Sequence, residues 1–97
     1  MDKMVILVYR SADEKEITHC VSECDIAGYT KIPKVYGKGK TGGARFGTHV
    51  WPGENEMMIV SSEELRIQDL LEMIKEKKSQ NRIKGIKAFV LPVEQVL

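Results

Sequence analysis

The feature that most constrains the fold is a pattern of strand, helix and strand that occurs twice within 97 residues. In the first half, Lys3–Arg10 is apolar on both of its faces, which predicts a central strand. A helix is predicted from Ser11, because apolar residues recur there at helical spacing, at Ile17, Cys20, Val21 and Cys24. Tyr29–Tyr36 is the second strand. Pro33 places it at a sheet edge or interrupts it, since proline donates no ladder hydrogen bond.

The second half repeats this order after a long glycine-rich connection. A strand is predicted over Glu56–Val60, and the helix that follows carries an apolar stripe of Ile67, Leu70, Leu71 and Ile74. The last strand is predicted over Ile86–Val93. Both helix starts, Ser11–Glu14 and Ser61–Glu64, have the form of a capping box, in which serine and glutamate satisfy free amides. Gly28 is expected to end the first helical unit.

Two successive β-α-β units predict an α+β fold of the ferredoxin-like βαββαβ type, formed as a single domain over residues 1–97. Its antiparallel sheet carries both helices on one face. The other face needs cover as well, because the first strand is apolar on both sides, with Val5, Leu7 and Tyr9 opposed to Met4, Ile6 and Val8. We therefore expect this second face to be buried against other subunits.

The connection between the two halves concentrates basic charge. The whole chain holds 15 basic and 14 acidic residues, but between Ile26 and Gly53 there are five basic residues and no acidic ones. The five are Lys31, Lys34, Lys38, Lys40 and Arg45. Glycines let backbone amides turn toward a ligand and lysines supply the counter-charge, so an anion such as phosphate is the expected guest. A pI near 7.8 argues against a nucleic-acid binder. The apolar run at Met4–Tyr9 is too short for a signal peptide or a membrane span, so a cytoplasmic location is expected.

Plainer interpretations of the same residues stand beside this one. The glycine-rich loop also fits a flexible hairpin, although its length from Gly37 to Asn55 is typical of functional loops. Lys31 and Lys34 also fit the solvated side of an edge strand. Within the loop, Trp51 suits packing better than ligand stacking, and His49 suits an ordinary hydrogen-bonding group better than a metal ligand.

The sequence offers little for catalysis. Its two histidines, His19 and His49, have no neighbouring nucleophile with an orienting carboxylate, so a nucleotide hydrolase is the least favoured of the functions considered and no enzyme activity is expected. Cys20 and Cys24 lie on one face of the predicted helix, where buried thiols are favoured over a disulfide or a metal pair.

The segment GYTKIPKVYGKGKTGG and the closing segment KAFVLPVEQV, from Lys87 to Val96, resemble those of the PII signal-transduction proteins over nearly the whole chain. The resemblance implies a homotrimer with clefts between subunits that bind ATP or ADP, and a T-loop at about residues 37–55 that regulates a partner, either a membrane transporter or an enzyme. It implies that Thr30 faces the adenine, Gly37 the nucleotide, and Lys40 and Lys87 the phosphates. Apart from the resemblance, Lys38 and Gly39 complete the predicted ligand residues, because a lysine flanked by glycines and unopposed by acidic residues can approach a polyphosphate. The predicted partner-facing loop residues are Arg45, His49 and Trp51.

Three departures from the family pattern narrow this expectation. Thr41 stands where the family has a glutamine that takes part in Mg-ATP and 2-oxoglutarate binding, and Gly53 stands where it has a lysine. No tyrosine lies between Gly37 and Gly53, so control by nucleotidylation is not expected. The CutA family shares the trimeric fold and an aromatic, lysine-bearing middle segment. A CutA-like metal-binding or metal-tolerance role through His49 is the alternative function.

Overall fold

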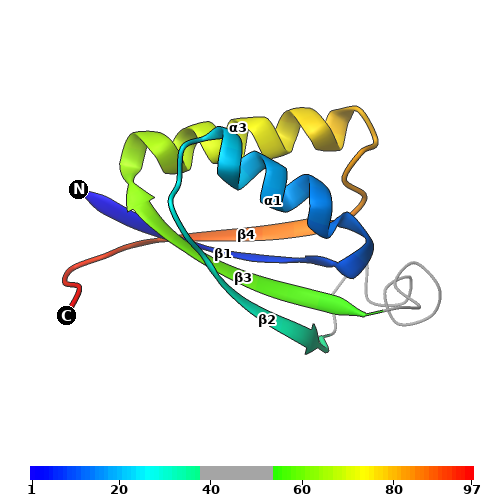
Figure 1. Ribbon diagram of the computed structural model, residues 1–97, viewed down its shortest axis with the longest axis horizontal. Helices are drawn as coiled ribbons and strands as arrows, with labels where there is room; N and C mark the ends of the chain where they lie inside the picture. The colour runs from blue at the N-terminus through cyan, green and yellow to red at the C-terminus, as the bar shows by residue number, and fades with distance from the viewer. Residues whose placement is uncertain (38–53) are drawn as a thin grey trace.

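The computed structural model describes residues 1–37 and 54–97 of the chain, and its elements follow the predicted order (Figure 1). In chain order they are the strand β1 (Asp2–Arg10), the short 3-10 helix η1 (Ser11–Asp13), the helix α1 (Glu14–Glu23), the strands β2 (Thr30–Val35) and β3 (Asn55–Glu63), the helix α3 (Glu64–Ser79) and the strand β4 (Ile86–Pro92). None of the described helices is long and apolar enough to cross a membrane.

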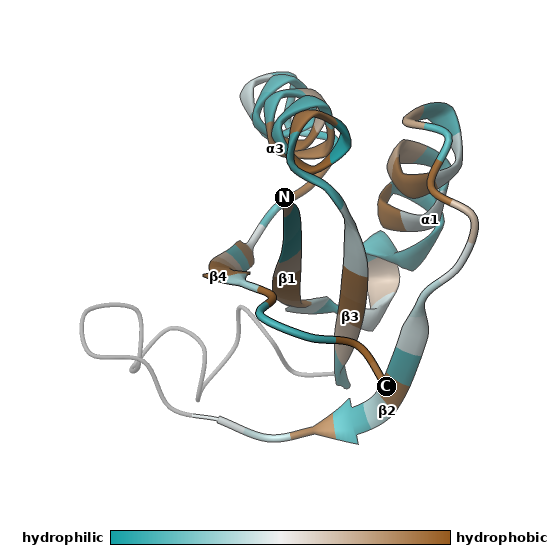
Figure 2. Cartoon of the chain, turned by 90° about the vertical axis from the view of Figure 1, so that its left-hand side faces the viewer, coloured by the Kyte–Doolittle hydropathy of each residue, from teal (hydrophilic) through white to brown (hydrophobic). Residues whose placement is uncertain are grey.

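The four strands form one antiparallel sheet in the order β2-β3-β1-β4. Both helices cover the same face of this sheet, and the other face carries neither of them (Figures 1 and 2). The ferredoxin-like α+β arrangement predicted from the two β-α-β units is therefore confirmed.

The central strand β1 separates two apolar layers because successive side chains of a strand point to opposite faces. Val5, Leu7 and Tyr9 are fully buried beneath the helices. They form one hydrophobic core with buried residues from the two helices, from β3 and from the turns after the helices. These residues are Ile17, Cys20, Val21, Cys24, Ile26, Met58, Val60, Ile67, Leu70, Ile74 and Ile83. Cys20 and Cys24 are free thiols within this core, as predicted, and burial raises the pKa of both.

The edge position of β2 matches the expectation drawn from its proline. Of the described strands, β3 alone pairs with β2, and the register between them shifts between Ile32 and Val35. Lys34 has a left-handed backbone there, with φ of 56°. Pro33 thus lies at a bulge on an edge strand, where its missing amide leaves no gap in the ladder.

The two predicted capping boxes are wrong. Neither α1 nor α3 has a side-chain hydrogen bond at its N-cap residue, and the buried hydroxyl of Ser11 has no partner among the described residues. Ser61 and Ser62 continue β3, where they pair with Met4 and Lys3 of β1. Pairing with the central strand carries β3 past the predicted end at Val60 as far as Glu63, and α3 then begins directly at Glu64.

Gly28 does not end the first helical unit. The left-handed residue that closes α1 is Asp25, with φ of 58°, and the amide of Ile26 then donates to the carbonyl of Val21 at 3.3 Å. The helix α3 ends in the same way at Asn81, with φ of 61°. Both are Schellman ends in which an Asx residue takes the position that glycine usually holds.

Candidate functional site

Most of the residues predicted to bind a ligand or a partner lie outside the described residues. This applies to the predicted loop positions after Gly37, namely Lys38, Gly39, Lys40, Arg45, His49 and Trp51. The structure does place Thr30, Gly37 and Lys87. The site can therefore be built from the sheet that carries these three residues.

The chain leaves the sheet before residue 38 and returns to it after residue 53 at the same end of the sheet. Asn55 pairs with Val35 on one side and with Arg10 on the other, so β2 ends, β3 begins and β1 ends in the same row. β4 begins beside them, because Ile86 pairs with Tyr9. Gly37, just after β2, and Lys87, in β4, consequently lie at the same end of the sheet.

Thr30 and Lys87 share the helix-free face but lie on opposite edges. Lys87 pairs with Val8, whereas Thr30 lies in a row with Ile59, Ile6 and Phe89, two residues farther along β1. A two-residue step returns to the same face of a sheet. With β3 and β1 between them, the two residues are about 14 Å apart across the strands. A single chain therefore does not gather them into one compact site.

The face between these two residues is apolar. Register places one continuous set of hydrophobic side chains on it: Met4, Ile6, Val8, Ile32, Met57, Ile59, Phe89 and Leu91. Phe89 at 52%, Leu91 at 42% and Ile32 at 40% are the most exposed of the set. The described residues leave this face uncovered, which is the property of a surface that packs against another molecule.

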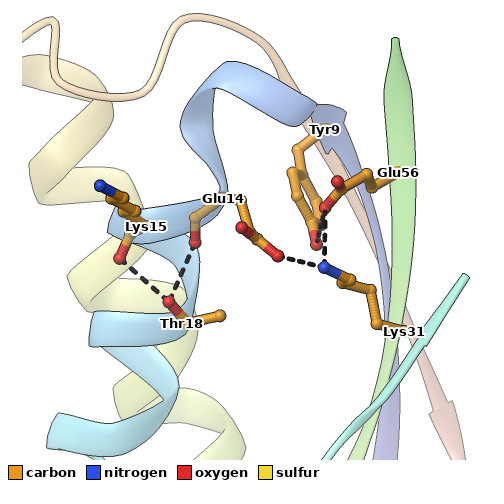
Figure 3. A network of polar contacts seen from close by, with 6 residues as sticks. All are labelled: Tyr9, Glu14, Lys15, Thr18, Lys31 and Glu56. Atoms are coloured by element: carbon orange, nitrogen blue, oxygen red, sulfur yellow. Dashed lines mark hydrogen bonds and ion pairs between the residues drawn. The ribbon is translucent and has the colours of Figure 1, made fainter. Parts of the chain in front are cut away.

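A polar network lies on the helix face at the same end of the sheet (Figure 3). The buried hydroxyl of Tyr9 donates to Glu56 Oε1 at 3.1 Å, and Lys31 Nζ lies 3.9 Å from the same oxygen. Lys31 also pairs with Glu14 in the first turn of α1. Burial, followed by the charge of Glu56, raises the pKa of Tyr9, and the hydrogen bond that Lys31 donates to Glu14 is the main cause of a raised pKa at Lys31.

Sequence reasoning missed this network. It allowed Lys31 only a solvated or ligand-facing role, whereas the lysine joins β2 to α1. Strand alternation was the available signal, because Lys31 lies between two residues of the open face, Thr30 and Ile32, and must point toward the helices.

A second polar cluster is centred on Asp13, the one charged residue that is buried among the described positions, at 4% exposure. Its carboxylate accepts two hydrogen bonds from the Arg10 guanidinium, at 2.9 and 3.1 Å. It also accepts one from the backbone amide of Lys84 at 3.2 Å. Nearby, Arg82 Nε lies 2.7 Å from Glu16 Oε1. The start of α1 thus holds the turn between α3 and β4 by two carboxylates.

No three His, Cys, Asp or Glu side chains come together to hold a metal ion within residues 1–37 and 54–97. His19 is exposed on α1, and His49, the predicted metal ligand, lies outside this part of the chain. The two polar clusters described above, around Tyr9 and around Asp13, consist of ion pairs and hydrogen bonds at the end of the sheet where β1 ends and β3 begins.

Comparison with known proteins agrees with this architecture. A sequence model of the family described as Nitrogen regulatory protein P-II matches residues 2–97. A PII-like signaling protein from Thermus thermophilus has 22% identity and a TM-score of 0.67, over 93% of this chain and 84% of that chain. CPII from Thiomonas intermedia K12, solved with ADP and bicarbonate, has 19% identity and a TM-score of 0.68, over 97% and 89% of the respective chains.

A protein of the DUF3240 family from Shewanella baltica OS155 shares the fold at lower identity. It has 11% identity and a TM-score of 0.73, over 98% of this chain and 92% of that chain. No curated protein sequence matches. Likeness at these identities shows the fold, and the match of the family model extends over nearly the whole chain.

Proposed function

The chain belongs to the nitrogen regulatory protein P-II family, and from this premise we propose that it is a trimeric signalling protein that binds an adenine nucleotide between its subunits. The nucleotide is ADP or ATP. Its binding is passed through the 37–55 loop to a partner, which is a membrane transporter or an enzyme. The protein itself acts as a cytoplasmic regulator without catalytic activity of its own.

The observation that carries this proposal is the placement of Thr30 and Lys87. Both lie on the helix-free face, yet at opposite edges of the sheet with apolar residues between them, so a charged ligand contacts both without crossing that apolar surface only if different copies of the chain supply them. The apolar residues between them give the copies a reason to associate, since their burial removes exposed Phe89 and Leu91 from water. A cleft between subunits then contains a lysine from one edge and a threonine from another.

The chemistry of the described residues suits a nucleotide. Lys87 is exposed, and its ammonium group is a suitable partner for phosphate oxygens. None of the described residues lies where a Cβ of residue 37 would be, so they leave the backbone of Gly37 open to a ligand. CPII has been solved with ADP and bicarbonate and also with ADP, AMP and bicarbonate, which makes these the first ligands to test.

Calorimetry of the full chain with ATP, ADP and AMP, each with and without bicarbonate, tests the ligand. We expect binding of ADP or ATP that weakens about tenfold or more in Lys87→Ala, which removes a charge-assisted phosphate contact. Lys78→Ala removes another exposed lysine, on α3, and should leave the affinity unchanged. Absence of heat for every nucleotide contradicts the proposal, and so does equal weakening by the two variants.

Sedimentation of the same samples tests the assembly. Ile6→Glu places a charge at the middle of the open face, where Ile6 pairs with Ile59 and Phe89, and should yield monomers that no longer bind nucleotide. Lys15→Glu changes an exposed residue of α1 and should remain assembled. A monomeric wild-type protein that binds nucleotide with full affinity would show that the site lies within one chain.

A further inference from the structure

The buried carboxylate of Asp13 joins two parts of the chain that are distant in sequence. An ionised carboxylate at this depth is costly unless its oxygens are paired, and here both are, by a bidentate guanidinium and a backbone amide. Bidentate pairing fixes orientation as well as distance. Asp13 therefore holds its partners in one arrangement more firmly than an exposed ion pair does.

One partner leads to the place where the 38–53 segment rejoins the sheet. Arg10 is the last residue of β1 and pairs with Asn55, the first residue of β3. The amide of Ser11, next along the chain, donates to the carbonyl of Glu54 at 2.8 Å. A movement of Arg10 with Asp13 would therefore displace Glu54 and Asn55, which are bonded to Ser11 and paired with Arg10.

The other partner leads to the proposed phosphate contact. Lys84 lies in the turn that connects α3 to β4, three positions before Lys87. Among the described residues, side chains at the start of α1 bond this turn at two points, where Asp13 accepts from the Lys84 amide and Glu16 pairs with Arg82. The Asp13 carboxylate is the buried one of the two, so it is the firmer support for the turn and for the start of β4.

We propose that Asp13 is a positioning residue that couples Lys87 to the sheet end at Glu54 and Asn55, so that a nucleotide bound at Lys87 changes the point where the loop segment rejoins the fold. The inference rests on the proposed function and names the route of its regulation. The physical basis is a single rigid group shared by both ends of the route, as coupling between two sites requires.

The tie between Arg82 and Glu16 provides a matched control. It joins the same turn to the same helix, but the Arg82 side chain is 54% exposed, so water and salt screen it. If any bond to this turn were sufficient for coupling, Glu16→Gln would have the same effect as a change at Asp13. If the buried carboxylate carries the coupling, Glu16→Gln leaves it intact.

The experiment follows backbone amide signals by NMR in the assembled full chain, with ADP and then ATP added to saturation. In the wild-type protein we expect shifts at Lys87, Glu54 and Asn55. In Asp13→Asn we expect the Lys87 shift to remain at saturation while the shifts at Glu54 and Asn55 fall by more than about half. Hydrogen exchange of the Lys84 amide should accelerate about tenfold in the same variant without ligand. Glu16→Gln should match the wild type in every signal.

Each outcome decides a different claim. Equal shifts at Glu54 and Asn55 in Asp13→Asn and in the wild type overturn the coupling, because a merely structural role leaves those shifts in place at saturation. Unchanged exchange at Lys84 overturns the positioning role. If neither nucleotide shifts the wild-type signals, the proposed function fails and the coupling with it, while ligand-free exchange still decides whether Asp13 holds the turn. If Asp13→Asn does not fold, Arg10→Lys replaces it, since lysine keeps the charge but not the bidentate geometry.

Discussion

Replacing Tyr9 with phenylalanine removes one hydroxyl from the interior and leaves the ring in place. Tyr9 is fully buried, and its hydroxyl donates to a Glu56 carboxylate whose side chain is only 12% exposed. Hydrogen bonds to charged groups contribute about 1.5–3 kcal/mol to stability. Because Glu56 keeps Lys31 as a second partner, we expect the lower value, so Tyr9→Phe should lower the free energy of unfolding by about 1.5 kcal/mol at neutral pH.

The same bond makes a definite prediction for alkaline solution. Burial and the neighbouring Glu56 charge raise the pKa of Tyr9 in the folded protein above its ordinary value of 10.0. The unfolded chain loses the phenolic proton first, so the stability from this group is complete below pH 10.0 and declines as the pH rises above it. One unit above the ordinary pKa the decline is about 1.4 kcal/mol. The difference between Tyr9→Phe and the wild type should therefore fall to nearly zero at about pH 11.

Urea unfolding followed by circular dichroism at both pH values measures this difference, at one protein concentration because assembly adds to stability. Tyr36→Phe is the matched control, since Tyr36 is 89% exposed and its replacement should change stability little at either pH. A Tyr9→Phe deficit of the same size at neutral and alkaline pH would refute the reasoning. So would an undiminished deficit in a Glu56→Gln background, because the hydroxyl would then not act through that carboxylate.

Two further predictions, each with its own control, test the core and the end of α3. Leu70→Ala should lower the free energy of unfolding by about 2–5 kcal/mol, because Leu70 is fully buried. Leu65 lies on the same helix but is 71% exposed, so Leu65→Ala should change the free energy of unfolding by less than about 0.5 kcal/mol. Similar losses in the two variants, measured by urea unfolding, would contradict the described core. Asn81→Ala should cost about 1 kcal/mol because φ is 61° there, and Asn81→Gly should not; equal melting temperatures for these two variants would show that the left-handed end of α3 is absent.

Local periodicity was sufficient to predict the elements of this fold. The alternation along β1 and the stripe of Leu70 and Ile74 on α3 depend only on which face meets the core, and that information is present within each segment. The edge position of β2 followed from Pro33 for a similar reason, because a missing amide is a property of the residue itself.

The wrong predictions concern features that distant parts of the chain decide. Ser61 and Glu64 have capping-box spacing, yet the strand β1 offers Ser61 a pairing partner 57 positions earlier, at Met4, and the ladder prevails over the local cap. Asp13 was missed because its partner Lys84 is 71 positions away. A local pattern contains no information about such a contact, so the bond between Asp13 and the turn before β4 could not be found from the sequence.

The proposed ligand site and the proposed coupling route differ in how many copies of the chain each of them needs. Thr30 and Lys87 lie on opposite edges of the open face, so the proposed site needs more than one copy of the chain, and its affinity depends on assembly by mass action. The contacts of Asp13 lie within one chain, and they run from the turn ahead of Lys87 to the start of β3. In the proposed trimer each subunit therefore has its own complete route from ligand to loop, although no subunit has a complete site. The proposed trimer can then respond at one loop for each cleft that is filled.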